Sequence, residues 1–393
     1  MGMTCHACGE GELTPFADLG HIPVLCGVHW ADAEAAAASP VGRMVLAYCP
    51  RCAYVRNIAF DPDVMVYDTT MDTNLHHSPA FQAFTADLVS HLAKRYSLAG
   101  KRVLDIGCGQ GEFLRELCHL GGCTGVGYDA MYAGPTGPDP SGATFHSGYA
   151  PRGAALPGFD FVTSRHWYEH VADPYELLAD LREQACDRPV QGYIEVPDAC
   201  YDLATAGWEV IYPHVSYFDA YSLRRIVERA GWRVEETGTL FSGMFRFIEF
   251  SSGDHGPKST DDGVSRAKLH DQRQKQLAAI EGFAARHEAE RKAWRDRIGE
   301  LVECGARPVL WGAGSRGVQF LTFADPDRHL SAVVDLNPRK WGRYLPVTAH
   351  RVDPPDTLTD LAPSAVIITN PAYRTEIADH LARLGIRAEL LVA

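Results

Sequence analysis

Apolar residues along this 393-residue chain follow two patterns, short continuous runs and repeats at every third or fourth position. The runs predict buried strands, and the repeats predict helices. Runs of strand length occur at 102–106, 124–129, 159–163 and 191–197, and two more strands are predicted within 232–250. Helices are predicted to start near Pro79, Glu112, Pro174 and Ala220. Strands alternating with helices predict an α/β fold with a doubly wound sheet of seven strands.

A similar alternation returns near the end of the chain, where apolar runs begin at Pro308, Ala332 and Ala365. Before it, a polar linker at 253–263 leads into a stretch at 264–303 whose apolar residues have helical spacing. At about 1.5 Å per residue, a single helix there could span about 60 Å. We therefore expect four parts: an N-terminal module at 1–78, a first α/β domain at 79–252, a linker and connecting helix at 253–304, and a second Rossmann-like α/β domain at 305–393.

Composition narrows the class of protein. Hydrophobic residues make up 46% of the chain and charged residues 22%, as in globular proteins. The net charge of −13 argues against a nucleic-acid partner. No apolar run approaches the ~20 residues that a membrane helix needs, so no membrane partner is expected. Eleven cysteines without a visible export signal favour a reducing compartment, and we expect a cytoplasmic protein.

The run at 102–106 leads into a glycine-rich turn, Asp105-Ile-Gly-Cys-Gly-Gln-Gly111. Glycines there let the backbone turn tightly into a helix and approach a ligand closely. The next strand ends in Asp129, whose carboxylate could accept both ribose hydroxyls of an adenosyl group. This spacing resembles the class I S-adenosylmethionine (SAM) methyltransferases. It implies that SAM is held by Asp105, Gly107, Gly109, Gly111 and Asp129. A Rossmann turn that binds NAD, or no nucleotide, is the alternative.

Two C-x-x-C pairs, Cys5/Cys8 and Cys49/Cys52, provide the four thiolates of a tetrahedral zinc site. Gly9 follows the first pair, where a residue free to adopt positive φ helps to close the knuckle. Four protein ligands leave no open position on the metal, so we expect structural Zn²⁺. Four unrelated free cysteines are the alternative.

Several polar residues are expected around the same ligand. In open α/β sheets, ligands lie at the carboxyl ends of strands, so His166 and His170, after the strand at 159–163, should line the cofactor pocket. Buried, hydrogen-bonded core histidines are the alternative. Residues 60–80 gather Tyr67, His76 and His77 just before the first helix, where they could fold over the site and contact substrate. A solvated linker is the alternative there.

The segment Ile211-Tyr-Pro-His-Val-Ser-Tyr-Phe218 follows the strand at 191–197. An imidazole such as that of His214 suits removal of a proton from a carbon beside a carbonyl. The hydroxyls of Tyr212 and Tyr217 could stabilise the resulting enolate oxygen. An aromatic core loop is the alternative.

The second α/β unit also opens with a glycine turn, Gly312-Ala-Gly-Ser-Arg-Gly317, with Asp335 at the next strand end. Taken alone, G-x-G-x-x-G fits NAD. Because helix N-termini attract phosphate in general, the diphosphate of a nucleotide substrate is the alternative. Asn337-Pro-Arg-Lys-Trp-Gly-Arg343 adds three cations beside the turn.

Together these parts resemble the zinc-containing, three-part C-methyltransferases that act on nucleotide-linked keto-deoxysugars in antibiotic pathways. The cysteine pairs and both glycine turns carry the resemblance with the loop 212–218, and it covers nearly the whole chain. It implies that His214 is the base and that Tyr212 and Tyr217 adjoin the sugar. It also implies that the second α/β domain holds substrate and does not bind NAD. Its candidate contacts are Gly312, Gly314, Ser315, Arg316 and Lys340.

Two positions depart from that family: Pro213 stands where its loops carry Glu, and Ser242-Gly243-Met244 replaces a glycine-rich turn. The resulting expectation is SAM-dependent methylation of carbon beside a carbonyl, in a small, nucleotide-activated keto-sugar. N- or O-methylation of a related metabolite, a non-catalytic protein with this fold and an NAD-dependent enzyme are the alternatives.

Overall fold

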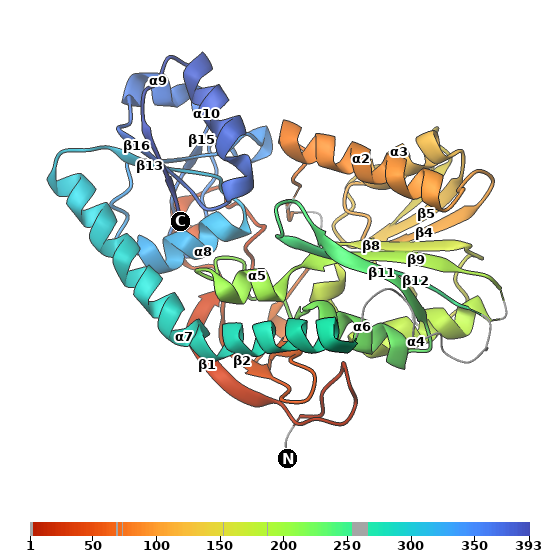
Figure 1. Ribbon diagram of the computed structural model, residues 1–393. Helices are drawn as coiled ribbons and strands as arrows, with labels where there is room; N and C mark the ends of the chain where they lie inside the picture. Colours follow the sequence, from red (N-terminus) through yellow and green to blue (C-terminus); the bar gives the residue numbers. More distant parts are fainter. Residues whose placement is uncertain (1–2, 68–69, 73, 152, 187, 254–265) are drawn as a thin grey trace.

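The computed structural model describes residues 3–67, 70–72, 74–151, 153–186, 188–253 and 266–393 (Figure 1). Most of the linker expected at 253–263 lies outside these residues. Three sheets organise the chain: one of four strands, one of eight and one of five. They define an N-terminal module (β1–β3), a first α/β unit (α2–β12) and a second α/β unit (β13–β17).

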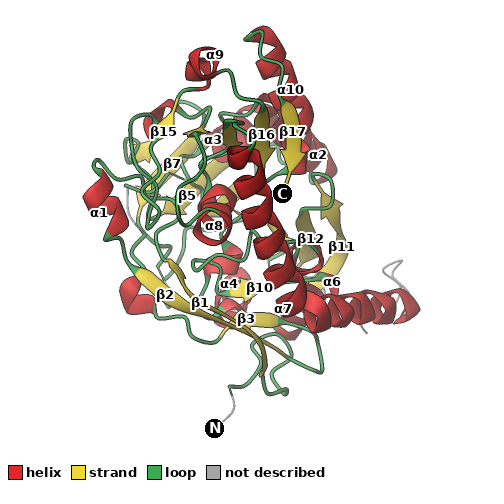
Figure 2. Ribbon diagram, turned by 90° about the vertical axis from the view of Figure 1, so that its left-hand side faces the viewer, coloured by secondary structure: helices red, strands yellow, loops and turns green. Residues whose placement is uncertain are grey.

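The N-terminal module is an antiparallel sheet that borrows a strand from elsewhere. Its own strands are β1 (Thr14–Pro23), β2 (Val41–Tyr48) and β3 (Val55–Asn57), with α1 (Ala33–Ala37) before β2 and a 3₁₀ turn, η1 (Pro62–Val64), after β3. The fourth strand, β10 (Ser216–Tyr217), comes from the first α/β unit and pairs antiparallel with β3 (Figure 2). The segment that contains His214 is thereby attached to this module.

The first α/β unit is built on the eight-stranded sheet, in the order β11-β12-β9-β8-β4-β5-β7-β6. Five strands run parallel: β4 (Arg102–Ile106), β5 (Thr124–Asp129), β7 (Ala143–Ser147), β8 (Phe161–Arg165) and β9 (Gln191–Pro197). Antiparallel to its neighbours run β12 (Phe245–Ser251), β11 (Arg233–Leu240) and the short β6 (Gly137–Pro138). The sheet has eight strands where seven were predicted, because the edge strand β6 has two residues and is too short to produce an apolar run; no predicted run marked β7 either.

Helices cover both faces of this sheet (Figure 1). On one face lie α2 (Pro79–Arg95) and α3 (Glu112–Gly121), and on the other α4 (Pro174–Ala185) and α6 (Ala220–Arg229). A 3₁₀ turn, η2 (Tyr168–His170), follows β8, and α5 (Ala199–Ala204) follows β9. The predicted start of α2 is explained by Ser78, whose hydroxyl accepts from the Phe81 amide, with Pro79 in the first turn.

The second α/β unit is fully parallel, in the order β15-β14-β13-β16-β17. Its strands are β13 (Pro308–Trp311), β14 (Ala332–Val334), β15 (Val352–Asp353), β16 (Ala365–Ile368) and β17 (Glu389–Val392). Its helices are α8 (Ser315–Ala324), α9 (Leu358–Leu361) and α10 (Arg374–Arg383), with 3₁₀ turns η3 (Pro338–Lys340), η4 (Pro355–Thr357) and η5 (Pro371–Tyr373).

The long helix α7 (Arg266–Glu303) joins the two α/β units and packs against both (Figures 1 and 2). Its Phe283 lies in a hydrophobic core that also contains side chains from the N-terminal module and from β13 and α8. Aromatic contacts join the N-terminal module to α7: the ring centroids of Phe16 and Phe283 lie 6.1 Å apart. Among the described residues, no helix combines the length and apolar character needed to span a membrane.

Candidate active site

A cavity of about 380 Å³ lies between the two α/β units and the N-terminal module. It lies at the carboxyl ends of parallel strands of both α/β units, as ligand sites of α/β folds do. Most of the residues expected from the sequence line it: Tyr67, His76, His77, Asp105, Gly107, Gly109, Asp129, His166, His170, His214, Gly312, Gly314, Ser315, Arg316 and Lys340.

The first glycine turn forms the cofactor side of this cavity. Gly107, Gly109 and Gly111 all adopt positive φ, at 80°, 56° and 86°. A Cβ on Gly107 would collide with Trp167, and one on Gly111 with Phe145, whereas one on Gly109 would meet nothing within 4 Å. Gly109 therefore leaves open space on the cavity side, and Gly111 serves the packing of the turn.

Asp129 closes the first turn and faces the cavity. Its Oδ2 accepts from the Gly109 amide at 2.8 Å, and its Oδ1 accepts from the Met131 amide at 2.7 Å. Burial raises its pKa, which these two amides oppose. Each carboxylate oxygen has a second lone pair, so both remain able to accept a ribose hydroxyl. The residues present thus fit an adenosyl group.

Asp105 lies behind the turn, at the end of β4. It is buried, and its Oδ1 accepts from the Thr163 hydroxyl of β8 at 2.7 Å. Burial raises its pKa to about 7, although the Thr163 bond and the charge of Arg165 oppose that rise. This carboxyl group ties β4 to β8 at the floor of the cavity.

His166 has a constrained place in the cavity wall. Its φ of 51° is in the left-handed region, and its Nε2 lies 2.8 Å from Oε1 of the buried Glu195. Burial alone would raise the pKa of Glu195, but the charge of Arg165 and the bond to His166 lower it to about 2. A strained, pinned histidine at a cavity wall is typical of a functional position.

A cluster of Glu169, His170 and His214 forms the opposite wall. Oε1 of Glu169 lies 4.0 Å from Nε2 of His170 and 4.0 Å from Nε2 of His214. Nδ1 of His170 lies 2.8 Å from the Pro213 carbonyl and 3.1 Å from the Tyr67 hydroxyl. Burial lowers the pKa of both histidines to about 3 and raises that of Glu169 well above 4.5.

The structure does not bring Tyr212 and Tyr217 to the cavity. The Tyr212 hydroxyl accepts from the Asp61 amide at 2.8 Å, and the Tyr217 hydroxyl donates to the Ile211 carbonyl at 3.2 Å. The chain turns at Pro213, so His214 faces the cavity while both tyrosine rings pack into the hydrophobic core. Tyr67, which lines the cavity, has its hydroxyl beside His170.

The four paired cysteines come together as one cluster, with all Sγ atoms within 4.8 Å of one another. Cys5 and Cys52 lie 3.5 Å apart, and Cys8 and Cys49 lie 3.7 Å apart. A tetrahedral site with Zn–S bonds of about 2.3 Å requires sulfurs about 3.8 Å apart, so the donor set fits zinc. Gly9, with φ of 76°, closes the first knuckle as expected.

This cysteine cluster is linked to the His214 segment. The strand β3 begins at Val55, just after Cys52, and pairs with β10. The Tyr54 hydroxyl lies 2.6 Å from the Ser216 hydroxyl, and the Asn57 amide donates to the Val215 carbonyl at 3.0 Å.

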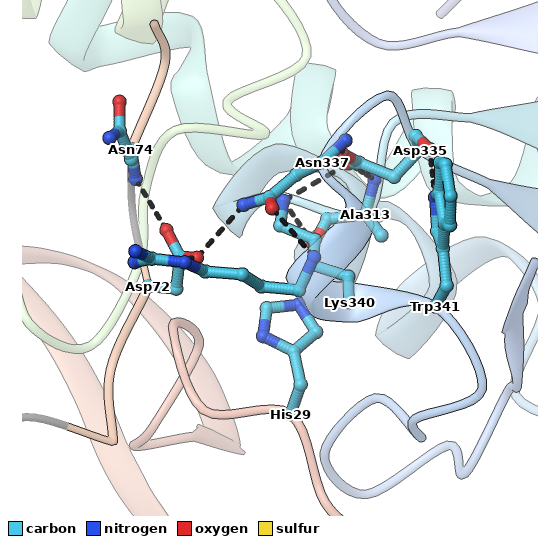
Figure 3. A network of polar contacts seen from close by, with 9 residues as sticks. His29, Asp72, Asn74, Ala313, Asp335, Asn337, Lys340 and Trp341 are labelled. Atoms are coloured by element: carbon cyan, nitrogen blue, oxygen red, sulfur yellow. Dashed lines mark hydrogen bonds and ion pairs between the residues drawn. The ribbon is translucent and has the colours of Figure 1, made fainter. Parts of the chain in front are cut away.

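The second glycine turn faces the cavity through a different set of contacts (Figure 3). Asp335 accepts from the Ala313 amide at 2.7 Å and from the Asn337 amide at 2.8 Å, as Asp129 does from its own turn. In addition, Lys340 lies 3.0 Å from its Oδ2. Burial alone would raise the pKa of Asp335, but the charge of Lys340 lowers it.

Arg316, at the start of α8, crosses to the first α/β unit. Its Nε donates to Glu209 at 2.5 Å, and its Nη2 lies 3.4 Å from Asp202. Neither acid was expected from the sequence, because the pairing depends on how the two units pack. The predicted substrate contacts of Arg316 and Lys340 stay predictions, since both cations already have carboxylate partners.

The segment before α2 links the N-terminal module to both α/β units. Asn74 donates to Glu112 at 2.8 Å. Asn337 donates to Asp72 at 2.9 Å (Figure 3). The Ser78 hydroxyl donates to Glu376 of α10 at 2.6 Å. His76 and His77 therefore belong to a segment that is fixed on both sides and covers the cavity.

Two family models match this chain. A methyltransferase domain matches residues 75–237, and a C-methyltransferase C-terminal domain matches residues 246–390. No curated protein matches. Among solved structures, a SAM-dependent methyltransferase from Mesorhizobium loti is 18% identical over 42% of this chain and 97% of that one, with a TM-score of 0.34. Magnesium protoporphyrin IX methyltransferase from Synechocystis PCC 6803, with bound SAH, is 17% identical over 44% and 84%, with a TM-score of 0.32.

Proposed function

The chain is a SAM-dependent methyltransferase with a class I Rossmann-like fold, and we propose that it methylates carbon beside a carbonyl group of a small acceptor. The observation that carries the proposal is the position of His214, buried in the wall of the cavity that the SAM turn also lines. The match of residues 246–390 to a C-methyltransferase C-terminal domain supports transfer to carbon.

The residues divide the work as follows. Gly107, Gly109 and Asp129 would hold the adenosyl part of SAM, which when bound supplies the methyl group. His214 would remove the proton from the acceptor carbon, because burial keeps its imidazole neutral at physiological pH and so able to accept a proton. The Tyr67 hydroxyl, beside His170, is placed to stabilise an enolate oxygen.

The acceptor that we propose is a small keto-sugar-like molecule that is linked to a nucleotide. The first-turn amides of α8 lie behind Gly314 and could receive a phosphate. A second candidate, an acceptor without diphosphate, is favoured because the Arg and Lys residues that line the cavity in the described part of the chain, Arg165, Arg316 and Lys340, are paired with carboxylates. The remaining alternatives are N- or O-methylation of a related metabolite and a non-catalytic role.

The deciding experiment is a mass-spectrometric assay with SAM in deuterated water, on matched panels of nucleotide-linked and free keto-sugars. C-methylation predicts a methylated product and deuterium exchanged into residual acceptor at the same carbon. His214→Ala should abolish both while SAM affinity stays unchanged, whereas His119→Ala, at an exposed position on α3, should change neither. Product without exchange of that C–H would favour N- or O-methylation. SAM binding without product would remove the sugar from the proposal.

We also propose that the four-cysteine cluster binds structural zinc. The metal would fix the start of β3 and, through β10, the His214 segment. Elemental analysis should find about one zinc per chain in the wild type and in Cys304→Ser, an exposed control, and none in Cys52→Ser. Because metal binding is coupled to folding, Cys52→Ser should also lower the melting temperature. Wild-type protein free of zinc would refute the assignment.

A further inference from the structure

The His214 segment lacks an acidic neighbour in sequence, because Pro213 stands immediately before the histidine. A buried imidazole that accepts a proton acquires a positive charge in a poorly solvated place, which is costly without a compensating anion. Within the described residues, the structure supplies a carboxylate from a different segment. Glu169 belongs to η2, after β8, some forty residues earlier in the chain.

The carboxylate of Glu169 lies near His170 and His214, and its Oε2 lacks a hydrogen-bond partner among the described residues. Its side chain is buried, with the residue 2% exposed, and His214 is 4% exposed. Oε1 lies 4.0 Å from Nε2 of His214, and Oε2 has no hydrogen-bond partner among the described residues. A carboxylate buried without a full set of partners is expensive to keep in the fold, so it indicates a function.

The backbone fixes this pairing. The Glu169 carbonyl accepts from the Val215 amide at 2.9 Å, which joins η2 to the residue after His214. The Pro213 carbonyl lies 2.8 Å from Nδ1 of His170, the residue after Glu169. Two contacts thus hold the segments side by side, and the His170 and His214 rings lie 4.9 Å apart in a T-shaped arrangement.

We propose that Glu169 is the positioning residue of His214 and supplies, from η2, the negative charge that the Pro213-containing loop lacks. This rests on the proposed function, in which His214 is the base. No hydrogen bond spans the 4.0 Å between Glu169 and Nε2 of His214, so the imidazole lone pair is not tied up by the carboxylate. The carboxylate acts through His214 and takes no part in bond making at the acceptor.

The proton balance is simple. The acceptor C–H bond breaks, its electron pair enters the enolate, and the proton forms an N–H bond on His214. The new imidazolium then faces the Glu169 carboxylate. Burial raises the pKa of free Glu169, and the positive sulfonium of bound SAM in the same cavity would favour its ionised form.

The pH dependence of this step depends on every group that faces His214. Among the described residues, these are, besides Glu169, His166, His170, Glu209, Tyr217 and Arg316, while the Tyr67 hydroxyl contacts the adjacent Pro213 carbonyl. Electrostatic interactions with His166 and Arg316 lower the pKa of His214 beyond the effect of burial, and a hydrogen bond with the Glu209 backbone opposes them. An ionised Glu169, 4.0 Å from Nε2 of His214, would raise this pKa, so removal of its carboxylate should lower the pKa of His214 in the loaded enzyme.

The test compares Glu169→Gln, Glu169→Asp and the exposed control Glu281→Gln in the full-length zinc-loaded enzyme. We expect Glu169→Gln to slow deuterium exchange and methyl transfer on the order of 10²-fold, within the range of general base catalysis, with the SAM Kd unchanged. Glu169→Asp should recover at least part of that loss. In Glu169→Gln the acidic limb of the pH profile of kcat/KM should also move to lower pH, which a merely structural loss would not cause.

Other outcomes overturn the inference. Full activity of Glu169→Gln, or equal loss in the Asp variant with an unmoved pH profile, would refute it while leaving His214 as the base. A second divalent metal in the wild type that is lost in Glu169→Gln would assign the cluster to metal binding instead. Failure of the proposed function looks different, since the wild type would then show no exchange and His214→Ala no effect.

Discussion

The two α/β units of this chain carry the same motif with opposite electrostatics. In each, the acid at the end of the second strand accepts from a turn amide, Gly109 for Asp129 and Ala313 for Asp335. Among the described residues no cation forms an ion pair with Asp129, and burial raises its pKa. Asp335 has Lys340 at 3.0 Å, which lowers its pKa.

The comparison shows that a glycine turn and an acid define a geometry but do not define a ligand. Asp129 presents uncompensated acceptors to the cavity, as an adenosyl ribose requires. Asp335 is already neutralised by Lys340, and Arg316 of the same turn is bound to Asp202 and Glu209. The second turn is thus suited to holding the two units together around the cavity.

The largest expected effect separates these two acids. Asp129→Ala should weaken SAM binding on the order of 10²-fold, since it removes two charge-assisted hydrogen bonds of about 1.5–3 kcal/mol each, part of which water recovers. Asp335→Ala should leave the SAM Kd within about twofold, and neither protein should bind NAD. Isothermal titration calorimetry with SAM and with NAD measures both. Equal losses in the two variants would erase the contrast between the turns.

How far the sequence predicts this arrangement depends on the range of the interaction. Local patterns predicted β4, β9 and the start of α2 at the residues observed, because aliphatic runs and an N-cap serine act within a few residues. The pairing of β10 with β3 left no local pattern. It depends on two short segments that come together only in the folded chain.

The candidate site divides in the same way. Its glycines and strand-end acids were predictable because a turn needs them at fixed spacing. Lys340 was recognised as a cation near the second turn, but its pairing with Asp335 needs the geometry of η3. Glu169 followed a predicted strand, where the rule that selected His166 and His170 could have found it. Tyr212 and Tyr217 were placed at the site because they lie close to His214 in one short loop, and closeness in sequence does not tell which way each side chain points.

The next effect concerns what the glycines do. A Cβ on Gly317 would lie 2.1 Å from the Gly312 carbonyl oxygen, where the backbone cannot yield. Gly317→Ala should therefore cost about 1–3 kcal/mol of stability, as overpacking does, without changing SAM affinity. Gly109→Ala meets open space but has φ of 56°, so it should cost about 1 kcal/mol and weaken SAM binding by placing a methyl group in the cavity.

Thermal unfolding measures the stability of both glycine variants, and SAM titration measures their affinity for SAM. Gly299→Ala in α7 is the matched control, because its Cβ would meet nothing within 4 Å and its φ is not positive, so it should leave binding unchanged and not destabilise. If Gly317→Ala instead lost SAM affinity at unchanged stability, the second turn would have to be reconsidered as a cofactor site.

The smallest expected effect is the opposite pH response of the two acids. The folded pKa of Asp335 lies below its ordinary 3.8, so its charge stabilises the fold above that value, and this is lost as the pH falls through the lowered pKa. The folded pKa of Asp129 lies above 3.8, so its charge costs stability at neutral pH, and the cost disappears as the pH falls through the raised pKa. At neutral pH, Asp335→Asn should thus lose about 1–2 kcal/mol through its weakened ionic bonds. Asp129→Asn should lose less, because removal of the costly buried charge offsets the amide hydrogen bond that the single oxygen of Asn cannot accept.

Urea midpoints from about pH 7.5 to about pH 4, with exposed Asp87→Asn as control, should show the Asp129→Asn loss growing on acidification, as the wild type is relieved of its buried charge, while the Asp335→Asn loss persists. Parallel pH responses would mean that Lys340 does not distinguish the two turns, and the electrostatic contrast between them would fail.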